Sequence, residues 1–158
     1  MNVAAVGVEF GGERALFDLE LGQGALLGHV RRLDPRRIEV ELLGSDLAVR
    51  ATVADMVALP VGEGSFLIGL VDAASGRPRS TDAGPQRGSL TVMPAGTIRS
   101  DNGSNSWVFR RGASLYPHVG GNCHLVEGET LRQVMTILAG EVAPGERLAL
   151  GHYVADHG

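Results

Sequence analysis

Lysine is absent from this 158-residue chain, and all 14 of its basic residues are arginine. A phosphate-binding loop of the Walker type needs a lysine to reach the β- and γ-phosphates of a nucleotide. Schiff-base catalysis needs a lysine amine as its nucleophile. The missing lysine therefore excludes both of these chemistries from this segment.

Cysteine and long apolar runs are also scarce. The single cysteine, Cys123, excludes an internal disulfide and fits a reducing compartment. No apolar stretch approaches the ~18 residues that a membrane span needs, and the first residues carry no basic stretch ahead of an apolar one, as a secretory signal would. The sequence predicts a cytoplasmic protein that does not bind a membrane.

Glycine, by contrast, is abundant, at 23 residues of 158, against a usual share of ~7%. Because these glycines follow no collagen-like period, they indicate many tight turns, as in an all-β fold. The formal net charge of −4 gives no global attraction to nucleic acid.

Short stretches of alternating polarity run along most of the chain. The stretch "IEVEL" places Ile38, Val40 and Leu42 on one face of a strand, and "LAVRATV" at residues 47–53 repeats the pattern. Further strands are expected at residues 25–30, 65–71, 89–93, 106–109 and 147–154. Turns rich in proline, glycine, asparagine or aspartate separate most of them. These features predict one mainly β domain over residues 1–158: a small closed or partly open barrel of about six or seven strands.

Two stretches depart from this pattern. Residues 72–89 contain no aliphatic side chain larger than alanine and are predicted to form an exposed loop. A short C-terminal helix is predicted over residues 130–139, with a capping box of Thr130 and Gln133 and with Gly140 as its stop. The apolar face of this helix is expected to contain Leu131, Val134, Met135 and Leu138.

Several patterns approach known sites without completing them. Gly22, Gly24 and Gly28 nearly match a dinucleotide-binding loop, but they precede a strand rather than a helix, so we interpret them as turn and strand-packing glycines. Adjacent Cys123 and His124 point to opposite faces of an extended chain, which indicates a buried thiol beside a surface imidazole rather than a catalytic dyad. The other histidines lack metal-ligand spacing. We expect no catalytic, cofactor-binding or metal-binding residues here.

Paired arginines are the remaining polar signal. Two pairs flank a predicted Asp34–Pro35 turn, and a third pair follows a predicted strand. Arginines at a hairpin tip can bind phosphates or the carboxylates of a partner, although a solvated turn paired with nearby acids such as Glu39 and Glu41 is the simpler explanation for them. No aromatic residue lies among them, which disfavours stacking on single-stranded nucleic acid. The candidate partner-binding residues are Arg31, Arg32, Arg36, Arg37, Arg110 and Arg111.

Two long stretches carry a family likeness. Residues 27–44, "LGHVRRLDPRRIEVELLG", are followed by "LPVGEGSFLIG" at 59–69. Residues 109–126, "FRRGASLYPHVGGNCHLV", are followed by the predicted helix and by "PGERLALGHYV" at 144–154. In order and in pieces such as "ELLG" and "RRG-x-x-x-YP", they resemble the N-terminal HAS barrel of HerA/FtsK-type ATPases.

This resemblance implies that a RecA-like motor, with its phosphate loop, ATP and Mg²⁺, would follow the strand expected at 148–154. In that family six motors form a ring that translocates DNA, and the barrels stack as a collar. The resemblance therefore implies a hexamer in the full-length protein and a barrel without a cofactor of its own. It also implies docking of a nuclease or of an antiphage-defence effector, with only indirect contact to DNA.

The arginine turn, the 72–89 loop and the predicted tip at residues 99–106 are the candidate docking surfaces. Two alternatives to the collar remain. A stand-alone ligand-binding barrel would need an open interior, which the large aliphatic and aromatic side chains expected inside disfavour. These are Ile38, Leu42, Val49, Phe66 and Ile68. A barrel that grips DNA directly is disfavoured by the acidic net charge.

Overall fold

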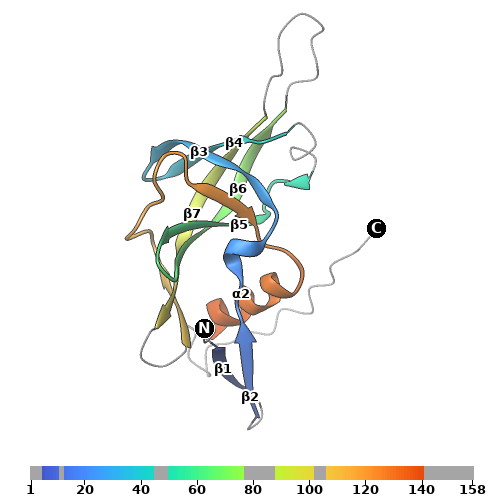
Figure 1. The fold of residues 1–158 in the computed structure, drawn as a ribbon, viewed down its shortest axis with the longest axis vertical. Helices are drawn as coiled ribbons and strands as arrows, with labels where there is room; N and C mark the ends of the chain where they lie inside the picture. The colour runs from blue at the N-terminus through green and yellow to red at the C-terminus, as the bar shows by residue number, and fades with distance from the viewer. Residues whose placement is uncertain (1–4, 11–12, 45–49, 77–87, 102–105, 141–158) are drawn as a thin grey trace, which may run out of the picture.

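The computed structural model shows a mainly β protein with one α-helix near its end (Figure 1). It describes residues 5–10, 13–44, 50–76, 88–101 and 106–140. Strands β1 (Ala5–Phe10) and β2 (Glu13–Asp18) form a separate antiparallel hairpin that projects from one end of the molecule. A short 3-10 helix, η1 (Leu21–Gln23), leads from this hairpin to the barrel. Within the described ranges, no helix has the length and apolar character to cross a membrane.

Six antiparallel strands close into a barrel. In spatial order they are β3 (Leu26–Asp34), β9 (Asn122–Leu125), β5 (Met56–Gly62), β6 (Ser65–Ser75), β7 (Ser89–Asp101) and β4 (Arg37–Leu42). The ring is complete because β4 pairs with β3 on one side and with β7 on the other. A seventh strand, β8 (Ser106–Arg111), pairs with β7 outside the ring. The predicted small barrel of six or seven strands with one C-terminal helix is confirmed, and the barrel is closed.

Strand β7 is long enough to belong to the barrel wall and to support β8 as well. Its residues 89–92 pair with β4, and residues 96–101 of the same edge pair with β8. Pro94 lies between these two segments and has no N–H to donate to a neighbouring strand. The pairing partner therefore changes at Pro94, which brings the start of β4 and the end of β8 to one edge of β7.

Aliphatic side chains fill the barrel interior, as the alternating pattern predicted. In β4, Ile38, Val40 and Leu42 are fully buried. The same cluster includes Leu27, Val30, Val57, Leu59, Leu67, Val71, Leu90, Val92, Cys123 and Leu125. Each valine or leucine buried in this way contributes ~1.5–3 kcal/mol relative to an exposed one.

A second core lies outside the barrel wall, beneath helix α2 (Gly128–Gly140) (Figure 1). Outward-facing residues of the wall pack there against Val134 and Ile137 of the helix. Two residues predicted to point into the barrel, Phe66 and Ile68, belong to this outer cluster instead. That prediction was wrong because a strand covered on both faces is apolar on both faces, so its alternation does not identify the interior.

Helix α2 begins earlier than predicted, and its buried face differs from the predicted one at one residue: Leu131, Val134 and Leu138 pack on the outer core as predicted, with Ile137 in place of Met135. Its first residue is Gly128, so Thr130 lies within the helix and the predicted capping box is wrong. Val134 and Ile137 are buried, whereas Met135 is 53% exposed. Residues 134, 135 and 137 are close enough around the helix axis to belong to one apolar face. Contact with the barrel wall decides which of them are buried.

The predicted strand over residues 47–53 is wrong in the part that the structure describes. The backbone N–H and the hydroxyl of Thr52 donate hydrogen bonds to the Asp55 carboxylate, at 2.7 and 3.1 Å. A side chain that accepts a nearby backbone N–H competes with strand pairing, and the chain turns here. Val53 is consequently exposed rather than inward-facing. Residues 47–49 lie outside the described residues.

The loop predicted over residues 72–89 is shorter than expected, because its two flanks are paired strand. β6 continues to Ser75 and β7 begins at Ser89, and the two serine hydroxyls are hydrogen-bonded at 2.7 Å. Residues 77–87 lie outside the described residues, as does the strand predicted over 147–154.

Glycines 24 and 28 lie where backbone segments pass too closely for a side chain. A Cβ on Gly28 would overlap the carbonyl oxygen of Glu41 on β4, and one on Gly24 would overlap that of Leu125 on β9. The interpretation of these residues as packing glycines is therefore confirmed.

Candidate partner-binding surface

The arginine-bearing turn forms as predicted. Strands β3 and β4 pair down to Asp34 and Arg37, and the backbone N–H of Arg36 donates to Oδ1 of Asp34 at 2.9 Å. This aspartate turn, with Pro35 in it, closes the hairpin. The hairpin carries four exposed arginines and is called the arginine hairpin below. They are Arg31, Arg32, Arg36 and Arg37.

Acidic side chains neutralise little of this hairpin. Among the described residues, the one ion pair of the hairpin arginines joins Nη2 of Arg37 to Oδ2 of Asp72 on β6 at 3.9 Å, with the two side chains 69% and 37% exposed. An exposed pair of this kind contributes at most ~1 kcal/mol. Across the part of the chain that the structure describes, no ion pair involves Arg31, Arg32 or Arg36. Their guanidinium groups are therefore available to a carboxylate or phosphate of a partner.

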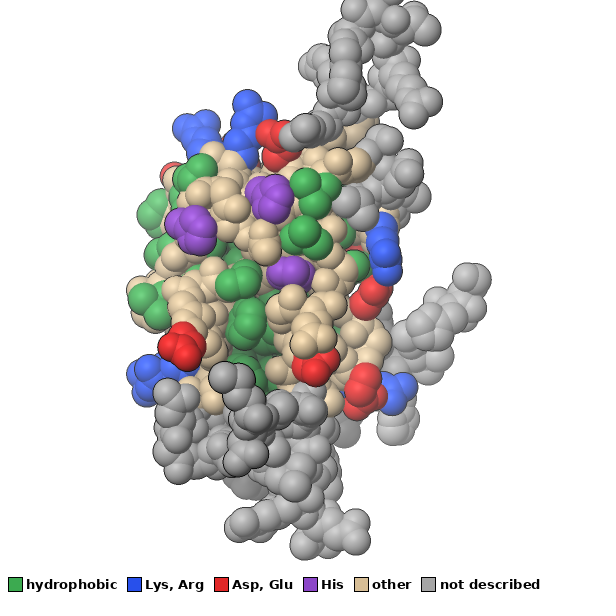
Figure 2. Space-filling model, in the orientation of Figure 1, with side chains coloured by type: hydrophobic (Ala, Val, Ile, Leu, Met, Phe, Trp, Pro, Cys, Tyr) green, Lys and Arg blue, Asp and Glu red, His purple; other side chains and the backbone are tan. Residues whose placement is uncertain are grey.

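Figure 2 shows basic side chains standing over the β3–β4 end of the barrel, with hydrophobic groups and imidazoles on the adjoining face. The arrangement leaves the positive charge in solvent rather than within a cleft.

Arg110 and Arg111 lie apart from this hairpin, although on the same edge of β7. Ile38 of β4 pairs with Val92 and Arg111 of β8 pairs with Gly96. These positions are four residues apart on β7, or roughly 13 Å at ~3.3 Å per residue. Both arginines are exposed, and Arg111 already interacts with another residue. The structure thus does not merge the two groups of arginines into one cluster.

The segment between β8 and β9 is a further part of this surface, which the sequence reasoning missed. We call residues 113–121 the pinned loop. Its Tyr116 hydroxyl donates to the carbonyl oxygen of Pro35 at 3.2 Å. The N–H of Gly120 donates to Val30 at 2.7 Å, and the N–H of Val30 donates to Gly121 at 2.8 Å. The sequence does contain a signal for an apolar loop here, the stretch "LYPHVGG". Its apolar residues have neither helical nor strand spacing, and the stretch ends in two glycines.

No thiol–imidazole dyad exists at Cys123 and His124. The Cys123 side chain is in the barrel interior, whereas Nδ1 of His124 donates to the carbonyl oxygen of Gly24 at 3.0 Å. The expected surface imidazole is wrong, since the segment around Gly24 covers His124 and buries it. Burial raises the pKa of the Cys123 thiol from 9.0 to about 12. A thiol that remains protonated at neutral pH is a poor nucleophile.

We therefore expect a disulfide reagent at pH 8 to label Cys123 no faster than the protein unfolds. Stability should also fall above pH 9, because the unfolded chain then releases the thiol proton that the folded chain retains up to about pH 12. The loss from this one group is about 1.4 kcal/mol at pH 10. Urea titrations at pH 8 and pH 10 measure this loss in the free energy of unfolding. In Cys123→Ala, the part of the loss that comes from the thiol should be absent. Rapid stoichiometric labelling of the native protein would contradict the buried thiol.

Other polar groups of the described residues do not assemble into a site. Among them, no group of three or more histidine, cysteine, aspartate or glutamate side chains could hold a metal ion. Two buried polar atoms, Nδ1 of His29 and Oγ1 of Thr97, have no hydrogen-bond partner in the described part of the chain. They lie on separate strands, β3 and β7.

No known protein-family model matches the chain, and no curated protein is significantly similar to it.

Proposed function

We propose that this chain is a non-catalytic β-barrel that docks a protein partner through the arginine hairpin. The observation that carries the proposal is the set of exposed guanidinium groups, three of them without an acidic partner among the described residues. Arginine is enriched at protein interfaces, and its planar guanidinium forms paired hydrogen bonds with a carboxylate. The filled barrel interior leaves the outer surface as the place where binding occurs.

We further propose that the barrel belongs to a HerA-type hexameric ATPase and DNA translocase. The support is the resemblance of residues 27–44 and 109–126, which supply β3, β4, β9 and the pinned loop. In such a ring each barrel would present its arginine hairpin to a nuclease or defence effector, while ATP and Mg²⁺ would bind a motor domain.

The coding sequence beyond codon 158 tests the HerA assignment. We expect a G-x-x-x-x-G-K-[ST] phosphate loop within a short distance of it. A different domain at that place would contradict the assignment to this family and would leave the docking role to be judged by binding experiments.

Reversing the charge of Arg36 and Arg37 is expected to weaken partner binding by about 30-fold or more, since two carboxylate contacts become repulsive. The proposal implies a neighbouring gene for a nuclease or effector; its product is the partner to use, and surface-based binding kinetics are the measurement. The melting temperature should change by less than about 4 °C, because at most one weak surface pair is lost.

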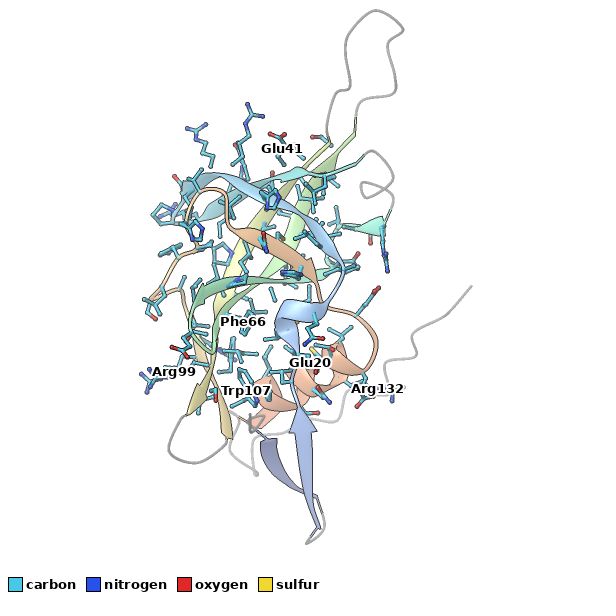
Figure 3. All side chains as sticks on the ribbon, in the orientation of Figure 1. Glu20, Glu41, Phe66, Arg99, Trp107 and Arg132 are labelled. Atoms are coloured by element: carbon cyan, nitrogen blue, oxygen red, sulfur yellow. The ribbon has the colours of Figure 1, made fainter. Side chains whose placement is uncertain are left out.

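A matched control reverses two arginines at the other end of the molecule, Arg99 and Arg132 (Figure 3). This control carries the same change in net charge and should leave partner binding within about twofold, because exposed charges more than a Debye length away are screened. Equal binding by both double variants would overturn the docking role of the hairpin.

A further inference from the structure

The pinned loop presents three apolar side chains to solvent. Leu115 is 49% exposed, Tyr116 is 38% exposed and Val119 is 62% exposed. Single exposed apolar residues are common on protein surfaces, whereas several on one short loop form a patch of the kind that marks an interaction site.

This patch is held in place by hydrogen bonds between the loop and the β3–β4 hairpin. The Tyr116 hydroxyl bonds to the turn of the hairpin, and the glycine pair at the end of the loop bonds to β3. Gly120 has a φ of +88°, in the left-handed region that side-chain-bearing residues rarely adopt. The N–H of Gly121 donates to the carbonyl oxygen of His118 at 2.9 Å and tightens the turn. A loop ordered before binding loses less conformational entropy when a partner binds.

The apolar patch and the arginine hairpin are adjacent along β3. Tyr116 is bonded to Pro35, in the turn between Asp34 and Arg36, and Gly120 is bonded to Val30, immediately before Arg31. The loop therefore runs beside β3 over the same length that carries the arginines. Figure 1 shows it lying against the tip of the β3–β4 hairpin.

From this arrangement we infer that the arginine hairpin and the pinned loop form one docking surface for an acidic segment with apolar anchor residues, belonging to a partner protein. Carboxylates of the segment would bind the guanidinium groups, and its apolar side chains would pack on Leu115, Tyr116 and Val119. The inference rests on the proposed docking function and adds the chemistry of the partner to it.

Two physical features favour a protein segment over other occupants. Arginine and tyrosine are among the residues that contribute most to protein–protein binding. The chain as a whole is acidic, with a net charge of −4, so the positive hairpin would orient an acidic partner toward this one place. A phosphate backbone would match the guanidinium groups but would leave the aliphatic patch without a counterpart.

Labelled peptides test this inference by fluorescence anisotropy. The parent peptide has aspartates and glutamates flanking leucines; a second peptide has amides in place of the acids, and a third has serines in place of the leucines. We expect Leu115→Ser with Val119→Ser to weaken binding of the parent peptide about tenfold, through lost apolar contact. The same variant should bind the serine peptide as the unaltered protein does.

A matched control replaces two equally exposed apolar residues elsewhere, Val53 and Met135, with serine. It should leave peptide affinity unchanged. Backbone amide resonances that shift on peptide binding should lie in residues 31–37 and 113–121. Because all four substituted residues are exposed, each variant is expected to keep the melting temperature of the unaltered protein.

The outcomes separate this inference from the proposed function. Peptide binding that depends on Arg36 and Arg37 but not on Leu115 and Val119 overturns the apolar half and leaves the docking role intact. Absence of binding by the parent peptide, or tighter binding of single-stranded DNA or phosphatidylserine vesicles at the same ionic strength, overturns the inference as a whole. Unchanged binding of the encoded partner by the Arg36/Arg37 variant instead overturns the docking role itself.

Discussion

Gly28→Ala is expected to destabilise the barrel by about 3 kcal/mol or more. The added Cβ would overlap the carbonyl oxygen of Glu41 and would lie 3.0 Å from the Cα of Leu42. All of these contacts are with backbone atoms, so no side chain can rotate to relieve them. The β3–β4 pair would have to separate, and this pair carries the arginine hairpin.

The matched control is Gly62→Ala, on β5. Nothing lies within 4 Å of a Cβ at Gly62, which is exposed. Its stability should change by no more than ~0.5 kcal/mol. Urea unfolding followed by circular dichroism measures both variants. Equal unfolding midpoints would show that β3 and β4 are not packed as closely as the structure has them.

Val134→Asp is expected to cost several kcal/mol and to release helix α2 from the barrel wall. Val134 has no exposed surface, and a buried carboxylate without a partner is strongly unfavourable. The only tryptophan, Trp107, packs against the same outer cluster. Its fluorescence should therefore shift to longer wavelength in this variant at low urea, before the barrel itself unfolds.

Met135→Asp provides the control on the adjacent residue of the helix. Met135 is 53% exposed, so the same new charge should change stability by less than ~1 kcal/mol and leave the tryptophan spectrum unaltered. The spacing of apolar residues alone assigns Met135 to the buried face. A larger loss for Met135→Asp than for Val134→Asp would support that assignment against the helix orientation in the structure.

These two predictions bear on function through the surfaces that each core supports. The interior core holds β3 and β4 in register, and hence the exposed arginines of their hairpin. The outer core holds α2 against β5 to β8 at the other end of the molecule. Substitution at Val134 is therefore expected to disturb the helix end more than the docking surface, whereas Gly28→Ala is expected to affect both.

Local sequence was sufficient for the elements that depend on near neighbours. Ile38, Val40 and Leu42 are inward-facing as their alternation predicts, because strand side chains alternate whatever the strand packs against. The Asp34–Pro35 turn forms because aspartate bonds to a backbone N–H two residues on, and this needs no distant contact. The same local turn leaves its arginines in solvent, which is why half of the candidate surface was predictable.

The remaining features depend on contacts between residues far apart in the chain. Whether Ile68 points into the barrel or beneath α2 is decided by the pairing of β5, β6 and β7, since its strand is apolar on both faces. The pinned loop is placed by the bond from Tyr116 to Pro35, 81 residues away, and no local pattern encodes such a contact.

The sequence by itself thus determined the β class, the packing glycines, the arginine turn and the lack of lysine chemistry. Tertiary structure alone decided how the ring closes, which face of each covered strand is interior, and that an apolar loop lies beside the arginines. The physical reason is one of range. Side-chain alternation and turn geometry act over a few residues, whereas burial is settled only when the whole barrel and its covering helix pack together.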